Sequence, residues 1–235
     1  MNFDRLAPHY DWMESWLAGE RLQNARTAWL GELRGRRHIL SVGEGHGRFA
    51  AACVDRHPAA PLTCVEASAG MLARAQRRLG PAAARVRWHR GDVFAWEPTT
   101  KFDAIVTCFF LDCFPPDMLP IVVGRLASWA APDAIWLVVD FTLPPHGPAR
   151  WRARAVHSLM YAFFRRIVGL PARRLTPPDD LLRAHGFHLA TRRKFDWGLM
   201  QADVWRRRGP SGTLGHDVRP SDFALVPETG LFHSW

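Results

Sequence analysis

Residues 39–54, ILSVGEGHGRFAAACV, constrain the fold of this chain more than any other stretch. An apolar run ends at Gly43, glycine recurs at Gly45 and Gly47, and an alanine-rich pattern typical of a helix follows. Glycine adopts a positive φ readily and has no Cβ to keep a ligand away from the backbone. A strand, a glycine turn and a helix in this order predict a turn whose backbone amides meet a nucleotide-like ligand.

Short apolar stretches alternate with helical patterns as far as residue 141, which predicts a parallel sheet covered by helices on both faces. After residue 141 the pattern changes to an aromatic-rich helix flanked by arginines, a short helix, and two strands joined by Asp-Trp-Gly, typical of a hairpin. The expected strands are residues 38–43, 62–67, 86–93, 102–111, 134–141, 187–195 and 199–207, and the expected helices include 10–34, 69–79, 118–130, 148–169 and 177–186.

Composition limits the class of protein. A length of 235 residues fits one α/β domain. The sequence contains no run of about 18 uncharged apolar residues, so no transmembrane helix is predicted. The first residues, MNFDRLAPHYDW, lack the pattern of a secretory signal. The four cysteines show neither CxxC pairing nor metal-ligand spacing, so we expect free thiols in a cytoplasmic protein and no metal site.

Positive charge is concentrated in one part of the chain. The formal net charge is +9, and residues 147–208 contain 14 Lys and Arg against four Asp and Glu. An uneven distribution of this kind indicates a basic face that meets an anionic partner or surface.

The ligand of the glycine turn follows from the acids that come after it. Glu66 ends the second strand, 23 residues after Gly43, where a carboxylate suits the hydroxyls of a ribose. A dinucleotide site would need glycine at position 48, where this chain has Arg48, so NAD fits less well than a cofactor without phosphate. Asp92, at the end of the third strand, supplies an acceptor for an adenine amino group. These features favour S-adenosylmethionine (SAM).

Six motifs in order resemble those of class I SAM-dependent methyltransferases, in particular the ubiquinone/menaquinone-biosynthesis-like branch: FDRLAPHYD, ILSVGEGHGRF, VEASAGMLARAQRRL, RGDVFAW, FDAIVTCFFLDCF and AIWLVVDF. The resemblance implies a Rossmann-like, mostly parallel seven-stranded sheet with helices on both faces and a C-terminal antiparallel hairpin. It implies a methyltransferase domain over residues 1–208, with a helical cap at 1–37 and a lid-like insertion at 142–176, followed by a tail at 209–235.

The resemblance also implies a set of cofactor-binding positions. Tyr10 is expected to close over the methionine part of SAM, and Cys108 or Phe109 to line the sulfonium side. Glu66 would hold the ribose and Met71 would pack on adenine. The full set is Tyr10, Gly43, Glu44, Gly45, Gly47, Glu66, Ala67, Met71, Asp92, Val93, Cys108 and Phe109.

Ser41 departs from the family pattern, because the family usually has Asp or Glu at this position. We hypothesise that Glu44 takes over the interaction with the ammonium end of the cofactor. The alternative is a degraded, weakly binding site in a non-catalytic protein.

Methyl transfer from a sulfonium needs a base only when the acceptor must lose a proton. Asp112 follows the fourth strand and Asp140 ends the fifth, so both are expected at the catalytic edge of the sheet, with Asp112 ranked first. Each acid also has a purely structural interpretation: Asp112 as the cap of a turn, and Asp140 as a partner in a loop hydrogen bond. His146, in a surface loop, and His157, on a helix face, rank below them.

The function favoured by these features is methyl transfer from SAM to C, O or N of a small, aromatic or lipid-like acceptor. Apolar residues and arginines over 149–174 suit such an acceptor and peripheral contact with an anionic membrane surface. The resemblance implies that this segment forms a lid over the acceptor pocket. A core-facing helix with a solvated basic face remains an alternative interpretation of the same residues. Alternative functions are a phospholipid N-methyltransferase and an RNA-binding or RNA-modifying protein, although no RNA-binding module appears in the sequence.

Overall fold

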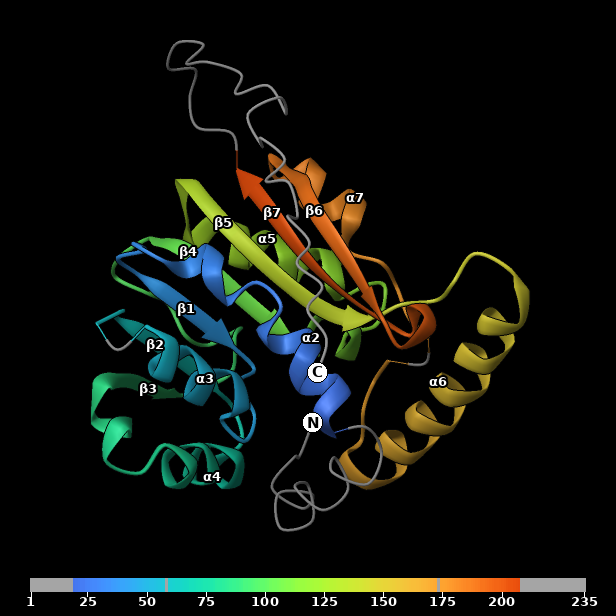
Figure 1. Ribbon diagram of the computed structural model, residues 1–235, viewed down its shortest axis with the longest axis horizontal. Coiled ribbons are helices and arrows are strands. Elements are labelled where there is room, and N and C mark those ends of the chain that lie inside the picture. The colour runs from blue at the N-terminus through green and yellow to red at the C-terminus, as the bar shows by residue number, and fades with distance from the viewer. Residues whose placement is uncertain (1–18, 58, 173, 208–235) are drawn as a thin grey trace, which may run out of the picture.

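A seven-stranded sheet forms the centre of the protein (Figure 1). The computed structural model describes residues 19–207 except 58 and 173. The strand order is β3-β2-β1-β4-β5-β7-β6. The first five strands are parallel, and β7 is antiparallel to both β5 and β6. The predicted fold class, including the C-terminal antiparallel hairpin, is confirmed.

The bounds of the elements follow the periodicity of the sequence. The strands are β1 Ile39–Val42, β2 Leu62–Glu66, β3 Val86–Arg90, β4 Phe102–Cys108, β5 Ala130–Phe141, β6 Phe187–Phe195 and β7 Met200–Arg207. The α-helices are α2 Gly19–Thr27, α3 Arg48–Arg56, α4 Ala69–Leu79, α5 Leu119–Trp129, α6 Gly147–Val168 and α7 Asp179–Ala184. The 3-10 helices are η3 Leu30–Leu33, η4 Gly80–Arg85, η5 Leu111–Cys113 and η6 Asp196–Gly198.

Two hydrophobic cores cover the two faces of the sheet. One joins α3, α4 and η3 to side chains such as Ile39, Cys64 and Val106. The other joins α5 and α7 to side chains such as Leu40 and Trp136. β1 and β2 are buried along their whole length, because a central parallel strand is covered on both sides. This arrangement explains why these strands are mostly apolar and show no alternation of apolar and polar residues.

The expected end of the third strand needs correction. The third strand was expected to run to Asp92, but β3 ends at Arg90 and Asp92 lies in the following turn. The Asp92 Oδ1 atom accepts a hydrogen bond from the Phe94 backbone N–H at 2.9 Å, which is a turn rather than a sheet contact. The N-terminal helical region is described only from Gly19, where α2 is followed by the short η3.

Helix α6 stands beyond the carboxyl end of β5, beside the rest of the domain (Figure 1). Its inner side buries Ala153, His157, Tyr161 and Val168, which recur at helical spacing. Among the described residues, no helix is long and apolar enough to cross a membrane.

Candidate functional site

The glycine turn between β1 and α3 lies at the carboxyl edge of the parallel strands. Gly43, Gly45 and Gly47 have φ values of 67°, 65° and 86°, a region that favours glycine. A Cβ on Gly47 would lie 2.6 Å from the Ala75 Cα, so this glycine lets α3 and α4 pack closely. A Cβ on Gly45 would meet nothing within 4 Å. The backbone at Gly45 is therefore open to an approaching molecule.

Phe110 covers the first glycine of the turn. A Cβ on Gly43 would overlap the Phe110 ring, so only glycine fits beneath that ring. Phe110 follows β4, and no pattern in the sequence indicated that its ring would reach the turn after β1. The contact exists because β1 and β4 are neighbours in the sheet.

Glu66 connects the glycine turn to the start of α4. Its two carboxylate oxygens accept hydrogen bonds from the Gly45 N–H at 2.9 Å and the Ser68 N–H at 2.8 Å. Ser68 caps α4 by accepting a hydrogen bond from the Met71 N–H at 3.1 Å. The last residue of β2 thus holds a carboxylate beside the open glycine, which is the place expected for a ribose-binding acid.

Glu44 lies against Ser41, the position at which the sequence departs from its family. The Ser41 hydroxyl donates to Glu44 Oε2 at 2.5 Å, and the Ala50 N–H in the first turn of α3 donates to Oε1 at 2.8 Å. Burial raises the pKa of Glu44 to about 7, although these hydrogen bonds and the charge of Arg26 lower it. Glu44 therefore places an acid next to position 41, at the start of α3.

Arg26 on α2 is a site residue that the sequence did not indicate. Its guanidinium lies 5.1 Å from the centre of the Phe109 ring, and its charge lowers the pKa values of Glu44 and Cys108. Phe109 has a φ of 53°, which is uncommon for a bulky residue and often marks a functional site. The spacing of apolar residues in this region predicted a helix but said nothing about the charged side chain it would turn toward the site.

The other predicted cofactor positions surround the same edge. Met71 is 2 % exposed in the first turn of α4, and Val93 is buried in the core beneath the turn after β3. Ala67 and Asp92 are exposed. Tyr10 lies outside the described residues.

The two candidate catalytic acids meet each other. Asp112 in η5 and Asp140 at the end of β5 are 7 % and 4 % exposed, and their carboxyl groups interact. Burial raises the pKa of Asp112 to about 6; burial and the Asp112 charge raise the pKa of Asp140 well above its ordinary value. Asp140 Oδ1 also accepts a hydrogen bond from the Phe110 N–H at 3.2 Å. The pair is thus tied to the turn that covers Gly43.

The two candidate histidines differ in burial. His146 is exposed and precedes α6. His157 is buried against Phe141, with ring centres 5.6 Å apart, and burial lowers its pKa. Tyr161 donates a hydrogen bond to the Asp112 carbonyl at 3.2 Å, which fastens α6 to the loop that bears the acid.

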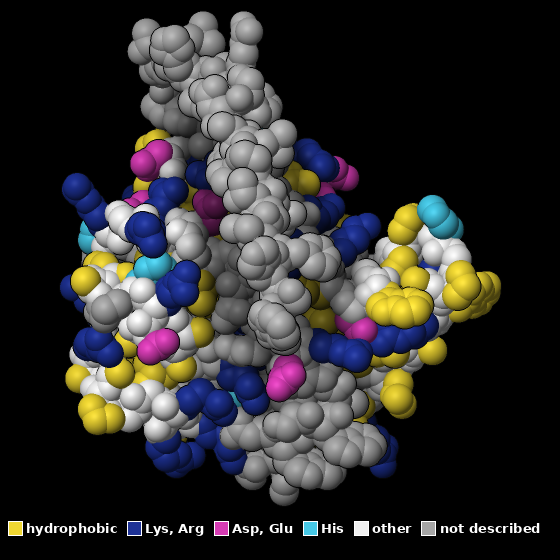
Figure 2. Space-filling view, viewed as in Figure 1, with side chains coloured by type: hydrophobic (Ala, Val, Ile, Leu, Met, Phe, Trp, Pro, Cys, Tyr) yellow, Lys and Arg dark blue, Asp and Glu magenta, His cyan; other side chains and the backbone are white. Residues whose placement is uncertain are grey.

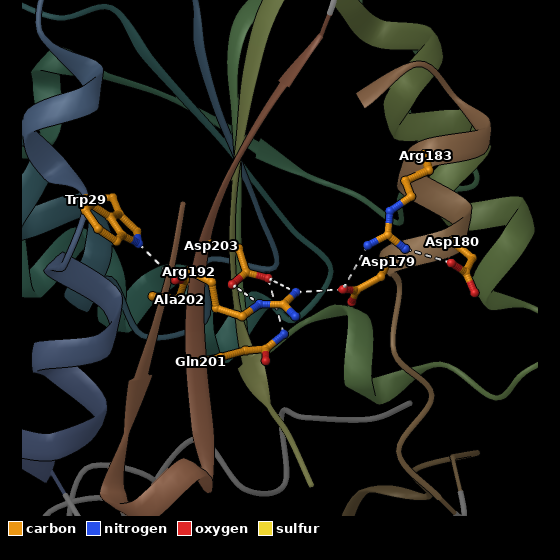
Figure 3. A network of polar contacts seen from close by, with 8 residues as sticks. All are labelled: Trp29, Asp179, Asp180, Arg183, Arg192, Gln201, Ala202 and Asp203. Carbon is orange, nitrogen blue, oxygen red and sulfur yellow. Dashed lines mark hydrogen bonds and ion pairs between the residues drawn. The ribbon is translucent and has the colours of Figure 1, made fainter. Parts of the chain in front are cut away.

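A polar network supports the wall of this region (Figure 3). Arg192 on β6 donates to both carboxylate oxygens of Asp203 on β7, at 2.8 and 2.7 Å, and to Asp179 on α7 at 2.7 Å. Gln201 donates to Asp203 Oδ2 at 3.2 Å and pairs with Asp140 across β5 and β7. Asp203 is completely buried, so the network fixes the hairpin and α7 against each other.

Strand order, glycine turn and acid at the end of β2 together define a Rossmann-like α/β protein with a ligand site at the carboxyl edge of its sheet. The comparison with known proteins makes the class specific. A family described as "Methyltransferase domain" matches residues 39–133.

Two curated relatives carry the same kind of domain. The ubiquinone/menaquinone biosynthesis C-methyltransferase UbiE of Paracoccus denitrificans is 34% identical over 155 residues, which are 63% of this chain and 61% of that protein. The tRNA1(Val) (adenine(37)-N6)-methyltransferase of Vibrio cholerae is 32% identical over 80 residues, 33% of this chain and 31% of that protein. The chain thus spans less than two thirds of the length of either relative.

A solved structure shows the same fold. The Burkholderia thailandensis 1,6-didemethyltoxoflavin-N1-methyltransferase, with bound 1,6-didemethyltoxoflavin and S-adenosylhomocysteine, superposes with a TM-score of 0.61 at 20% identity, covering 88% of this chain and 86% of that one. The family match and the UbiE relative support the predicted class, the class I SAM-dependent methyltransferases, and the solved structure shows that this chain shares their fold.

Proposed function

We propose that this protein transfers a methyl group from SAM to a small acceptor, at C, O or N. The observation that carries the proposal is the Glu66 carboxylate, held at 2.9 Å from the Gly45 N–H beside a backbone with open space in front of it. A carboxylate at this point accepts from ribose hydroxyls, and an open glycine lets the cofactor lie against the main chain.

The residues present fit SAM. Glu44 would supply a carboxylate for the ammonium end of the cofactor, and a cation bound beside it would stabilise its charged form, because burial raises its pKa to about 7. Met71 and the turn at Asp92 and Val93 would lie around the adenine ring. Cys108 and Phe109 would line the side from which the methyl group leaves. Tyr10 and the helical cap at 1–37 remain part of the proposal.

The cofactor supplies an activated methyl group, so the protein's task is to align the acceptor and exclude water. Orientation of this kind is worth about 7–11 kcal/mol in favourable cases. The strained turn at Phe109 and Phe110, held by Asp140, lies between the glycine turn and the cavity beside β5. This position suits a turn that separates cofactor from acceptor, with residues 142–176 as the lid.

Calorimetric titration of SAM, NADH and a short RNA tests the proposal. We expect SAM to bind, and binding to weaken at least about tenfold in Glu66→Gln, because charged hydrogen bonds are worth about 1.5–3 kcal/mol. Glu97→Gln is the matched control, since Glu97 pairs with Arg125 on the surface. Binding of NADH or RNA without SAM would replace the proposal, and RNA binding would favour the RNA-modifying alternative.

We also propose that the outer side of α6 contacts an anionic membrane surface. Trp151, Leu159 and Phe163 are 71%, 74% and 40% exposed along this helix, where Figure 2 shows hydrophobic side chains beside basic ones. α6 contains five arginines and no acidic residue. Apolar side chains ringed by arginine match a lipid surface that carries negative charge. This contact favours a lipid-like acceptor, and a phospholipid N-methyltransferase is the second candidate function.

Sedimentation with vesicles of phosphatidylserine and phosphatidylcholine tests the contact. We expect salt-sensitive binding that falls several-fold when Trp151→Ser and Leu159→Ser are combined. Ile121→Ser is the control, because Ile121 is 60% exposed but lies on α5, away from the arginines of α6. The contact would be contradicted if the wild-type protein, the double variant and the control sedimented equally, or if none of them sedimented with the vesicles.

The four free thiols are consistent with our further proposal of a cytoplasmic location.

A further inference from the structure

A small cavity lies next to the two catalytic candidates. Asp112, Asp140, Thr142 and Gln201 line it together with residues 175–178. Its volume of about 20 Å³ accommodates roughly one water-sized group. The cavity therefore fits a polar head of an acceptor, such as a hydroxyl group, and not a whole ring.

One oxygen of Asp140 is left for an occupant of this cavity. Oδ1 accepts from the Phe110 N–H, but the buried Oδ2 has no hydrogen-bonding partner of good geometry among the described residues. Its polar neighbours are the carboxyl and backbone N–H of Asp112. A buried acceptor without a partner is costly, so a donor in the cavity would be bound favourably.

The two carboxyl groups cannot both be charged at little cost. Buried acids in contact share a proton, and such a pair titrates as a unit. The pKa of Asp112 is raised to about 6 by burial, and the pKa of Asp140 is raised well above its ordinary range by burial and Asp112. At neutral pH the pair therefore holds one proton and one negative charge, and can both accept and donate.

The groups that face the pair remain neutral. Burial raises the pKa values of the Cys108 and Cys113 thiols and of the Tyr161 hydroxyl, and the charges of the two acids raise the last two further. The charge of Arg26 reaches Cys108, and that of Glu66 reaches Cys113. The pair is thus the proton-exchanging group of this cavity around pH 7.

We propose that Asp112 and Asp140 together bind a hydroxyl group of the methyl acceptor in this cavity and take its proton. The inference rests on the proposed function. As the acceptor oxygen forms its bond to the methyl carbon, the bond between that carbon and sulfur breaks and leaves a neutral thioether. The hydroxyl proton passes to the pair, which then holds two protons and later releases one to water.

Gln201 also lines the cavity, and a hydrogen bond fixes the orientation of its amide group. Its amide N–H donates to Asp203, so the amide oxygen points away from Asp203 (Figure 3). Because Gln201 and Asp140 are cross-strand partners, the amide and the carboxyl group belong to the same part of the sheet.

Binding of phenol and its methyl ether anisole tests the inference, because the two probes differ in the hydroxyl proton. Both are titrated by NMR against the full chain saturated with S-adenosylhomocysteine. We expect phenol to bind about tenfold or more tightly than anisole at pH 7.5, since a hydrogen bond to a charged group is involved. The ratio should fall toward one in Asp112→Asn and Asp140→Asn, and in wild-type protein below pH 6.

Infrared spectroscopy measures the shared proton without any acceptor. We expect the band of a protonated carboxyl group at pH 7.5 in the Glu44→Gln background, because Glu44 is another acid of the described residues whose pKa burial raises to about 7. The band should disappear with Asp140→Asn and weaken with Asp112→Asn, because a lone carboxyl loses its proton more easily. Both variants keep the size of the side chain, and circular dichroism confirms folding.

Equal binding of phenol and anisole, or no protonated band at pH 7.5, would overturn the inference. If S-adenosylhomocysteine binds every variant while the phenol preference is absent, the carboxyl-pair inference fails and the proposed function stands. If S-adenosylhomocysteine does not bind wild-type protein, the proposed function fails, and with it the inference.

Discussion

Glu44 and Ser41 show how the site can depart from its family in sequence and still place an acid at the start of α3. The serine hydroxyl and the Ala50 N–H both donate to the Glu44 carboxylate. The acid therefore lies beside the position at which the family usually has one. Glu44→Gln is expected to weaken SAM binding by about tenfold or more, because a charged partner of the cofactor's ammonium group is lost. Unchanged affinity in a calorimetric titration would contradict this role.

The same residue makes stability depend on pH. Because burial raises the pKa of Glu44 from 4.5 to about 7, the folded state holds a proton that the unfolded state has released. The free energy of unfolding should fall as pH rises from about 4.5 to 7, by about 3 kcal/mol at most. Urea titrations of wild-type protein and Glu44→Gln across pH 5–8 measure the difference. Parallel curves would show that the buried acid is not linked to stability.

Gly45 and Gly47 are expected to differ although both have positive φ. Alanine at either position costs about 1–2 kcal/mol for the left-handed backbone. Gly47→Ala also forces Ala75 away and should lower the free energy of unfolding further, whereas a Cβ at Gly45 meets no atom of the described residues within 4 Å. Gly45→Ala should therefore impair SAM binding more than stability. Thermal unfolding and calorimetry on both variants test the comparison; equal stability losses would contradict it.

The sequence could predict individual site residues better than their partners. Gly45 and Glu66 stand at recognisable positions relative to one strand each. Phe110 over Gly43, and Asp112 against Asp140, depend on the pairing of separate strands, which no local pattern encodes. The sequence allowed both acids to be chosen as candidates, but it could not predict the contact between them.

At the scale of elements, the alternation of apolar stretches and helical patterns predicted all seven strands. The boundary error at β3 arose because its last predicted residues form a turn held by the Asp92 side chain. The two sides of α6 were harder to separate. One side of this helix buries His157 and Tyr161, and another exposes Trp151 and Leu159. Because both sides carry apolar residues, periodicity alone could not tell which side faces the core.

The hairpin and α7 depend on one buried ion pair. Arg192→Met leaves the fully buried Asp203 without its cation and is expected to cost about 3–5 kcal/mol. Asp180→Asn is the matched control on α7, because Asp180 is exposed and its pair with Arg183 contributes about 0–1 kcal/mol. Urea unfolding measures both. Similar losses in the two variants would show that Arg192 does not hold the hairpin.

At the scale of the whole molecule, the sheet brings together pieces from distant parts of the chain. The cofactor turn follows β1, the proposed ribose acid ends β2, and the carboxyl pair follows β4 and β5. All lie at one edge because the five strands are parallel. The identity of the acceptor could not be predicted from the sequence, because it depends on the shape of a cavity that η5, β5, β7 and residues 175–178 form together.

A crystal structure of the chain with S-adenosylhomocysteine tests the central claim most directly. We predict that the ribose hydroxyls donate to the Glu66 carboxylate and that the ligand lies along Gly43–Gly47. Density for the ligand at another edge of the sheet, or a Glu66 side chain turned away from the ribose, would contradict the account.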